Sequence, residues 1–332
     1  MKQVAIIGAG SWGTALAIMA ARAGHAVRLW SRNATVVSSI NEQRVNARYL
    51  ISASIPANVI ATDNVGAALH GASLVLLAVP SHAARETLAV MSDQLDETAI
   101  IVSVTKGIEI ETTKRISEIA REVVGGEHPL VSLSGPSFAK EVVDGHPTAV
   151  VAASKDSAAA RVVQNDLSFE NLRIYTNTDV VGTELGGSVK NVMAIAAGMT
   201  AGLGFGSNSV AALITRGLAE ITRLARREGA QLETLMGLAG LGDLVLTCTG
   251  SLSRNRFVGE ELGKGRTLAE ITAEMNEVAE GINTARAVKK LADRAGLEMP
   301  ITNEVNAVLY DGRPARDAVA ELMSRPLREE IN

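Results

Sequence analysis

The sequence predicts an α/β protein in which a doubly wound, mostly parallel sheet is followed by an all-helical second domain. Two observations lead to this prediction. In the first half of the chain, short apolar runs of strand length alternate with stretches of helix length, as in parallel sheets covered by helices. The strand signal stops around residues 179–184, and from Leu185 onward the pattern is helical almost throughout. We therefore expect a sheet domain over residues 1–184 and a helical domain over residues 185–332.

The composition narrows the class of protein. At 332 residues the chain is long enough for two domains with separate cores, and 47% hydrophobic residues suit a tightly packed enzyme. A net charge of −4 without a basic block argues against nucleic acid as a partner. The single Cys248 excludes an internal disulfide and fits a reducing cytoplasm. Because the N-terminal apolar stretch is too short for a signal peptide and no apolar run reaches the length of a membrane span, we expect a soluble cytoplasmic protein.

The chain begins with a strand, a glycine-rich turn, a helix and a second strand. The apolar run Gln3–Ile7 is typical of a buried strand, and Gly8-Ala9-Gly10-Ser11-Trp12-Gly13 follows it directly. The helix-forming stretch Thr14–Ala23 and the apolar run Ala26–Trp30 complete the unit. In this context the G-x-G-x-x-G spacing indicates a dinucleotide-binding, Rossmann-like domain.

Each glycine of this fingerprint has a physical task. Gly8 permits the tight turn, Gly10 lets the cofactor diphosphate approach the backbone, and Gly13 lets the helix pack closely on the sheet. The diphosphate is then expected to bind the free N–H groups at the helix N-terminus. The sequence therefore predicts NAD(H) or NADP(H) as cofactor.

The end of the second strand bears on which of the two cofactors is bound. A site specific for NAD usually places an acidic residue there to hold the ribose 2′-hydroxyl. Here the chain reads Trp30-Ser31-Arg32-Asn33, and the next acid is Glu42. Because Arg32 can neutralise a 2′-phosphate, we predict that NADPH is accepted and preferred. The alternative is that Arg32 is a solvated loop charge.

Three further apolar runs end in loops that are polar or contain glycine. The runs are Ser73–Val79, Ala99–Val104 and Leu130–Leu133. They deliver Pro80-Ser81-His82, Thr105-Lys106-Gly107 and Ser134-Gly135-Pro136-Ser137. Because ligands of open α/β sheets bind outside the carboxyl ends of the strands, these loops are expected to line one cleft near the nicotinamide. Thr148–Ala153 and Leu172–Tyr175 are expected to add two more strands.

The apolar segment Leu185–Met199 contains two adjacent polar residues, Lys190 and Asn191. On a helix, the positions three and four away from Lys190 hold only glycines, a methionine and an alanine, none of which pairs with an ammonium. Burial of such a lysine lowers its pKa toward the range in which it exchanges protons. All five histidines lie in the first half of the chain, so a proton donor from the second half must be another residue type. The alternative is a lysine that extends to the surface at a bend.

Two other polar clusters follow in the second half. The glycine-rich stretch 237–244 presents one acid, Asp243, which is placed to orient Lys190 or to accept a hydrogen bond from a substrate hydroxyl; the alternative is an N-cap for a helix starting at Leu244. Ser253-Arg254-Asn255-Arg256 opens the predicted helix Arg256–Gly263. A hydroxyl, a guanidinium and an amide at a helix N-terminus form a phosphate receptor, although an ordinary capped helix with solvated arginines has the same sequence.

Taken together, these motifs resemble the NAD(P)-dependent glycerol-3-phosphate dehydrogenases, and the bacterial biosynthetic branch most closely. The motifs that carry the resemblance are Gly8-Ala9-Gly10-Ser11-Trp12-Gly13-Thr14-Ala15-Leu16, Gly135-Pro136-Ser137-Phe138-Ala139, Val189-Lys190-Asn191-Val192, Gly240-Leu241-Gly242-Asp243-Leu244 and Ser253-Arg254-Asn255. They cover essentially the whole chain, in the order and at the spacing of the family.

The resemblance implies reduction of dihydroxyacetone phosphate to sn-glycerol 3-phosphate for glycerophospholipid biosynthesis, with NADP(H) or NAD(H), by a homodimer without a metal. It implies Lys190 as proton donor and acceptor. The implied cofactor contacts, besides the fingerprint glycines Gly8, Gly10 and Gly13, are Ser11, Trp12, Arg32, Lys106, Ala139, Arg254, Val278 and Glu280. The implied substrate contacts are Lys106, Gly135, Ser137, Lys190, Asp243, Ser253, Arg254 and Asn255.

Two other readings compete with this one. Dehydrogenases of the β-hydroxyacid or 6-phosphogluconate type also join a Rossmann domain to a helical domain with a catalytic lysine. They typically open with Gly-Leu-Gly-x-Met-Gly, which this chain lacks. A catalytically inactive nucleotide sensor on the same fold would bind the cofactor without turnover.

Overall fold

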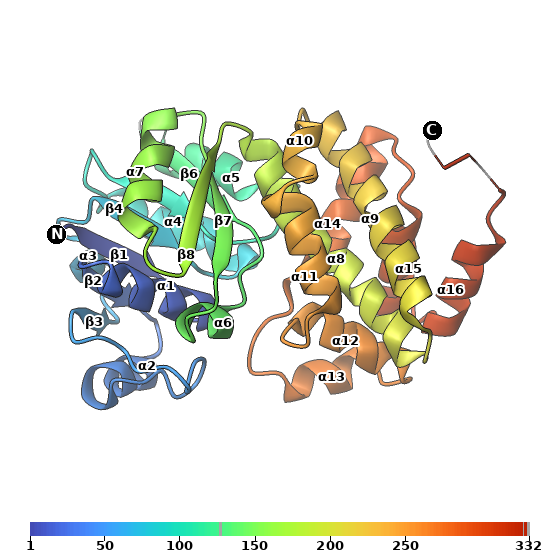
Figure 1. Cartoon of the computed structure of the whole chain (residues 1–332), viewed down its shortest axis with the longest axis horizontal. Coiled ribbons are helices and arrows are strands. Elements are labelled where there is room, and N and C mark those ends of the chain that lie inside the picture. Colours follow the sequence, from blue (N-terminus) through green and yellow to red (C-terminus); the bar gives the residue numbers. More distant parts are fainter. Residues whose placement is uncertain (126–127, 328, 331–332) are drawn as a thin grey trace.

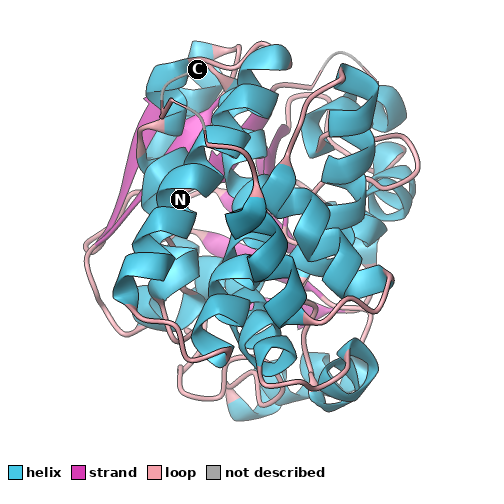
Figure 2. Ribbon diagram, turned by 90° about the vertical axis from the view of Figure 1, so that its right-hand side faces the viewer, coloured by secondary structure: helices cyan, strands magenta, loops and turns pink. Residues whose placement is uncertain are grey.

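The structure is a computed structural model that describes residues 1–125, 128–327 and 329–330. A part built around a sheet and a part built from helices lie side by side (Figure 1). Figure 2 shows the helical part in front and the strands behind it. The predicted fold class, an α/β sheet region followed by a helical region, is confirmed.

Eight strands form one sheet in the order β3-β2-β1-β4-β5-β6-β7-β8. The strands are β1 (Gln3–Ile7), β2 (Ala26–Trp30), β3 (Val59–Thr62), β4 (Leu74–Leu77), β5 (Ile100–Ser103), β6 (Leu130–Ser134), β7 (Thr148–Ala153) and β8 (Leu172–Asn177). All neighbours pair in parallel except β6 and β7. The chain therefore changes winding direction between β1 and β4, the position at which doubly wound sheets bind ligands.

Helices cover both faces of the sheet, which explains why its central strands are mostly apolar. In β1, Val4 and Ile6 belong to one buried cluster, and Ala5 and Ile7 belong to another. The first cluster includes side chains of α1 (Ser11–Arg22), α6 (Ala139–Val143) and α7 (Ser157–Leu167). The second includes side chains of α3 (Val65–Leu69), α4 (Ala84–Ser92) and α5 (Ile116–Val124). A short helix, α2 (Ala34–Ser38), follows β2.

The helical part is packed around one long helix, α8 (Val180–Gly202), most of which is buried. Around it lie α9 (Ser207–Arg227), α10 (Leu232–Leu235), a π-helical turn (Leu238–Gly242), α11 (Asp243–Thr249), α12 (Arg254–Gly263), α13 (Leu268–Glu274), α14 (Glu280–Ala295), α15 (Pro300–Tyr310) and α16 (Ala315–Ser324). Glycines allow α8 and α12 to touch: a Cβ on Gly259 would lie 1.9 Å from the carbonyl oxygen of Ile195. The long helix starts five residues before Leu185, because Asp179 caps it.

The first turn of α8 is anchored to the sheet part. Glu184 accepts hydrogen bonds from the backbone N–H of Ser117 at 2.8 Å, from the Ser117 hydroxyl at 2.6 Å and from Nη1 of Arg115 at 2.7 Å. Glu184 is 8% exposed, so the ion pair with Arg115 is largely shielded from water. This contact fixes the helix that carries Lys190 relative to α5.

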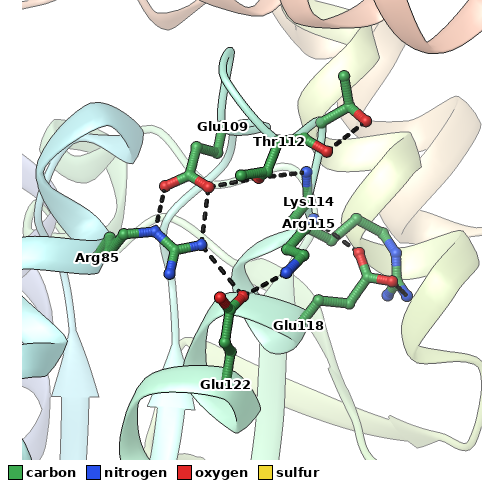
Figure 3. Close-up of polar contacts among 8 residues, drawn as sticks. Arg85, Glu109, Thr112, Lys114, Arg115, Glu118 and Glu122 are labelled. Carbon is green, nitrogen blue, oxygen red and sulfur yellow. Dashed lines mark hydrogen bonds and ion pairs between the residues drawn. The ribbon is translucent and has the colours of Figure 1, made fainter.

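A second polar network holds the segment after β5 (Figure 3). Arg85 on α4 donates to the two carboxylate oxygens of Glu109 at 2.8 and 2.9 Å, and to Glu122 on α5 at 3.3 Å. Lys114 donates to the same Glu122. The hydrogen bond from Arg85 lowers the pKa of the Glu109 carboxyl. The network ties the segment that begins with Lys106 to both helices.

One apolar stretch, Leu232–Thr249, has the length and mean hydropathy (1.3) of a membrane-spanning helix. In the structure, α10, the π-helical turn and α11 divide this stretch, and 44% of it is buried inside the protein. Its last part, α11, packs against α8. The stretch therefore contributes to the core around the site described next.

Candidate active site

A cleft of about 570 Å³ lies between the carboxyl ends of the parallel strands and the helical part. It brings together most of the predicted site residues: Gly8, Gly10, Ser11, Trp12, Gly13, Arg32, Lys106, Ser137, Lys190, Ser253, Arg254, Asn255, Val278 and Glu280 all line it. Three predicted residues, Gly135, Ala139 and Asp243, do not line it. The structure places Gly135 and Asp243 directly behind the lysines, and Ala139 at the start of α6 against the sheet core.

The glycine turn after β1 has the geometry that a dinucleotide needs. Gly8 has φ +121°, and a Cβ there would lie 2.4 Å from the carbonyl oxygen of Ala78. A Cβ on Gly13 would lie 1.9 Å from the carbonyl oxygen of Gly8. Gly10 has no neighbouring atom within 4 Å of the Cβ position, so a ligand can approach its backbone. Gly10 is also the N-cap of α1 and supplies no capping side chain to its N–H groups.

Two lysines that line the cleft share one buried carboxylate, which lies beneath its surface. Lys190 on α8 donates to Oδ1 of Asp243 at 2.5 Å and to the Thr247 hydroxyl at 2.7 Å. Lys106 donates to Oδ2 of Asp243 at 2.7 Å and to the carbonyl of Gly135 at 2.9 Å. Lys190 is 5% exposed and Asp243 1% exposed. Lys190 therefore does not extend to the surface, and Asp243 does not cap α11, whose N-cap is Gly242.

Burial shifts the pKa values of Lys190 and of the neighbouring Cys248. It lowers the pKa of Lys190 to about 8, while the Asp243 carboxylate opposes the shift and the positive charge of Lys106 adds to it. Burial also raises the pKa of the nearby Cys248 thiol to about 12, which leaves that residue a neutral apolar neighbour. A lysine with such a pKa exchanges its proton readily near neutral pH.

The cluster at the start of α12 is both a helix cap and part of the cleft. The Ser253 hydroxyl accepts a hydrogen bond from the N–H of Arg256 at 3.2 Å, which makes it the N-cap. Asn255 donates to the side chain of Asn191 at 2.9 Å and accepts from the N–H of Gly281 at 2.8 Å. Asn255 thus ties α12 to α8 and α14. Its side-chain amide has two N–H groups, and the bond to Asn191 uses one of them.

The other end of the cleft carries arginines. Arg32 is exposed and lines the cleft. Arg48 and Tyr49 also line it, and the guanidinium carbon of Arg48 lies 5.3 Å from the centre of the Tyr49 ring. Sequence analysis did not find Arg48 and Tyr49, because they lie in an irregular segment with no motif. Thr247 was missed as well; its position one helical turn after Asp243 is the signal that marks it.

Glu280 lies at the cleft but is already engaged. Its carboxylate accepts hydrogen bonds from the N–H of Ser81 at 3.0 Å and from the Ser81 hydroxyl at 2.5 Å. Burial raises the pKa of the Glu280 carboxyl, and the hydrogen bonds from Ser81 oppose this. Glu280 therefore links the start of α14 to the loop after β4. Within the described residues, no group of three His, Cys, Asp or Glu side chains is arranged to hold a metal ion.

Comparison with known proteins gives the same family over both halves of the chain. A family model described as the NAD-dependent glycerol-3-phosphate dehydrogenase N-terminus matches residues 3–160, and the corresponding C-terminus model matches residues 179–320. The chain is 55% identical to a Koribacter versatilis protein named glycerol-3-phosphate dehydrogenase (NAD(P)+), over 100% of this chain and 99% of that protein. It is 50% identical to a protein of the same name from a Geobacter species, over 99% of both chains. The crystal structure of glycerol-3-phosphate dehydrogenase from Coxiella burnetii matches it with a TM-score of 0.95 at 42% identity, covering 98% of this chain and 99% of that one.

Proposed function

The chain belongs to the NAD-dependent glycerol-3-phosphate dehydrogenase family, and from this premise we propose which of its residues perform the reaction. It is an NAD(P)-dependent oxidoreductase that reduces dihydroxyacetone phosphate to sn-glycerol 3-phosphate. A dehydrogenase of the β-hydroxyacid or 6-phosphogluconate type is not favoured. The observation that carries the residue assignment is the pair of lysine ammonium groups on the Asp243 carboxylate.

Lys190 is the proton donor in this proposal. The cofactor, when bound in the cleft, supplies the hydride to the ketone carbon. Negative charge then develops on the carbonyl oxygen, where an ammonium stabilises it and afterwards transfers a proton. Lys190 suits both tasks because its pKa of about 8 lies close to neutral pH. In the oxidation of glycerol 3-phosphate, neutral Lys190 accepts the proton.

Asp243 and Lys106 prepare Lys190 for this role. Asp243 holds the Lys190 ammonium in position and keeps it charged against the effect of burial. Two ammonium groups on one carboxylate leave one positive charge in the cluster, which favours an anionic substrate and an anionic transition state. Thr247 and the Gly135 carbonyl complete the hydrogen bonds of the two lysines.

The substrate phosphate is assigned to the start of α12. Arg254 supplies a guanidinium, Asn255 supplies an amide N–H, and α12 supplies the positive end of a ten-residue helix. Ser253 acts there through its capping of the helix. Ser137 lines the cleft on the opposite side, on the loop after β6.

The fingerprint turn, Ser11 and Trp12 are assigned to the cofactor diphosphate, and Arg32 to the 2′-phosphate of NADPH. Val278 and Arg254 line the same cleft and are assigned to the cofactor by family resemblance, Arg254 in addition to its place at the substrate phosphate. Lys106, Ala139 and Glu280 are assigned by family resemblance, and for Glu280 the bonds to Ser81 favour a positioning role. We divide the chain into a cofactor domain, residues 1–184, and a substrate domain, residues 185–332. Family membership supports a cytoplasmic homodimer that serves glycerophospholipid synthesis.

The decisive experiment follows NADPH oxidation with dihydroxyacetone phosphate, beside parallel reactions with NADH and with dihydroxyacetone, which lacks the phosphate. Turnover that requires the phosphate supports the assignment of Arg254 and Asn255. Turnover with a 3-hydroxy acid instead would point to the related dehydrogenases, and cofactor binding without turnover would point to a sensor.

A further inference from the structure

The segment between α13 and α14 places a carboxylate at the N-terminus of α1. Glu277 accepts a hydrogen bond from the Ser11 hydroxyl at 2.6 Å and a longer one from the Ser11 backbone N–H at 3.4 Å. Its other oxygen lies 3.1 Å from Nη1 of Arg254. Ser11 follows Gly10, the N-cap of α1, so this carboxylate occupies the positive end of a twelve-residue helix.

These donors are the ones that a cofactor diphosphate needs. In this fold the diphosphate binds the N–H groups of the first helical turn after the glycines. Carboxylate and phosphate oxygens accept from the same hydroxyl, amide and guanidinium donors. We propose that Glu277 is an internal competitor of the cofactor: its carboxylate takes the place of the diphosphate in the free enzyme and is displaced when NADPH or NADH binds. This inference rests on the assignment of Ser11 and Arg254 to the cofactor.

Displacement has a definite consequence for affinity. If the cofactor must displace Glu277, its apparent affinity is its intrinsic affinity multiplied by the fraction of protein molecules in which the carboxylate has already left. The Glu277 side chain is 23% exposed and that of Arg254 46% exposed, so their ion pair is partly solvated and can be broken by a stronger ligand. Departure of Glu277 releases the Ser11 backbone N–H and the Arg254 guanidinium in the same step, while the Ser11 hydroxyl keeps the carbonyl of Tyr49, at 2.7 Å, as an acceptor.

The test is the affinity of Glu277→Gln for NADPH and for ADP, which retains the diphosphate and lacks the nicotinamide. The change removes the negative charge with little change in size. We expect both ligands to bind roughly two- to fivefold more tightly, the range that corresponds to one partly exposed ion pair. Glu274→Gln is the matched control, because Glu274 lies on the neighbouring α13, pairs with Arg266 and has a side chain that is 64% exposed. That variant is expected to bind both ligands like the wild-type protein.

Unchanged or weaker NADPH binding by Glu277→Gln, relative to Glu274→Gln, would overturn the inference, since the carboxylate would then be neutral or favourable for the bound cofactor. If Glu277→Gln does not fold, Glu277→Asp replaces it: the side chain is shorter by one methylene and no longer reaches both Ser11 and Arg254, and tighter binding is again expected. Wild-type protein that does not bind NADPH would contradict this inference and the proposed function together. Normal wild-type binding without tightening in the variants contradicts only the role of Glu277.

Discussion

Lys190 and Asp243 form an ion pair of 2.5 Å between two almost completely buried side chains, one from the centre of α8 and one from the first residue of α11. Among the residues that the structure describes, Lys106 is the other charged partner of Asp243, and it uses the second carboxylate oxygen. The Asp243 carboxylate favours the protonated form of Lys190, whereas burial of Lys190 favours loss of the proton.

Replacing Lys190 by alanine removes the proposed proton donor. We expect kcat for reduction of dihydroxyacetone phosphate to fall about 10²- to 10⁴-fold, the usual contribution of a general acid. The affinity for NADPH should change little, because the diphosphate is assigned to the fingerprint turn and not to Lys190. Steady-state kinetics and direct NADPH titration measure the two quantities. Lys289→Ala, which removes an exposed lysine of α14, is the control, and kcat of Lys190→Ala close to that of the control would refute the role.

The pH dependence of the wild-type reaction follows from the lowered pKa of Lys190. Reduction requires the protonated lysine, so kcat/KM for dihydroxyacetone phosphate should be constant at low pH and fall as the pH rises through about 8. Oxidation of glycerol 3-phosphate requires the neutral lysine and should rise over the same range. Opposite pH profiles for the two directions are the expected result, and parallel profiles would exclude Lys190 as the titrating group.

Asp243→Asn tests the source of that pKa. The carboxylate opposes the effect of burial, so its removal lowers the pKa of Lys190 further and leaves two ammonium groups facing each other. The fall of kcat/KM for reduction should therefore begin at lower pH than in the wild-type enzyme. Breaking this buried pair should also cost about 3 to 5 kcal/mol in the free energy of unfolding. Asp293→Asn, at an exposed acid paired with Lys289, should alter neither quantity.

The sequence predicted those parts of the molecule that depend on local patterns. The bounds of β1, β2 and β7 were predicted correctly because apolar residues dominate each strand, with Arg28 the one charged residue among them. The edge strand β3 was missed because it has only four residues and directly follows an irregular segment, so no longer apolar run marks it. Local spacing showed no partner for Lys190, since its partner lies 53 residues away and reaches it only through packing of α11 on α8.

Arg32→Ala tests the cofactor preference. If the guanidinium binds the 2′-phosphate, NADPH loses a charge-assisted contact that NADH never makes. We expect KM for NADPH to rise about tenfold, the value of one hydrogen bond to a charged group, and KM for NADH to stay nearly constant. NADH is thus the internal control. An equal loss with both cofactors would contradict the assignment of Arg32 to the 2′-phosphate, and no loss with either would show that Arg32 is a solvated loop charge.

Gly259→Ala tests how far the substrate site depends on the contact between α8 and α12. A Cβ at this position would lie 1.9 Å from the Ile195 carbonyl oxygen and 2.9 Å from the backbone nitrogen of Met199, so the two helices must separate. Because overpacking costs about 1 to 3 kcal/mol, we expect the free energy of unfolding to fall by that amount. Separation also lengthens the bond between Asn255 and Asn191, at present 2.9 Å, and should raise KM for dihydroxyacetone phosphate more than KM for NADPH.

The control for this substitution is Gly206→Ala, where no atom lies within 4 Å of the added Cβ and φ is −81°. Denaturant unfolding and steady-state kinetics of the two variants compare the same chemical change in a packed and an open position. Equal stability and equal KM in both would mean that α8 and α12 separate without cost. In that case the glycine contact would not be what holds Asn255 beside Asn191. The bond that Asn255 donates to Asn191 and the bond that it accepts from the N–H of Gly281 would then position the amide by themselves.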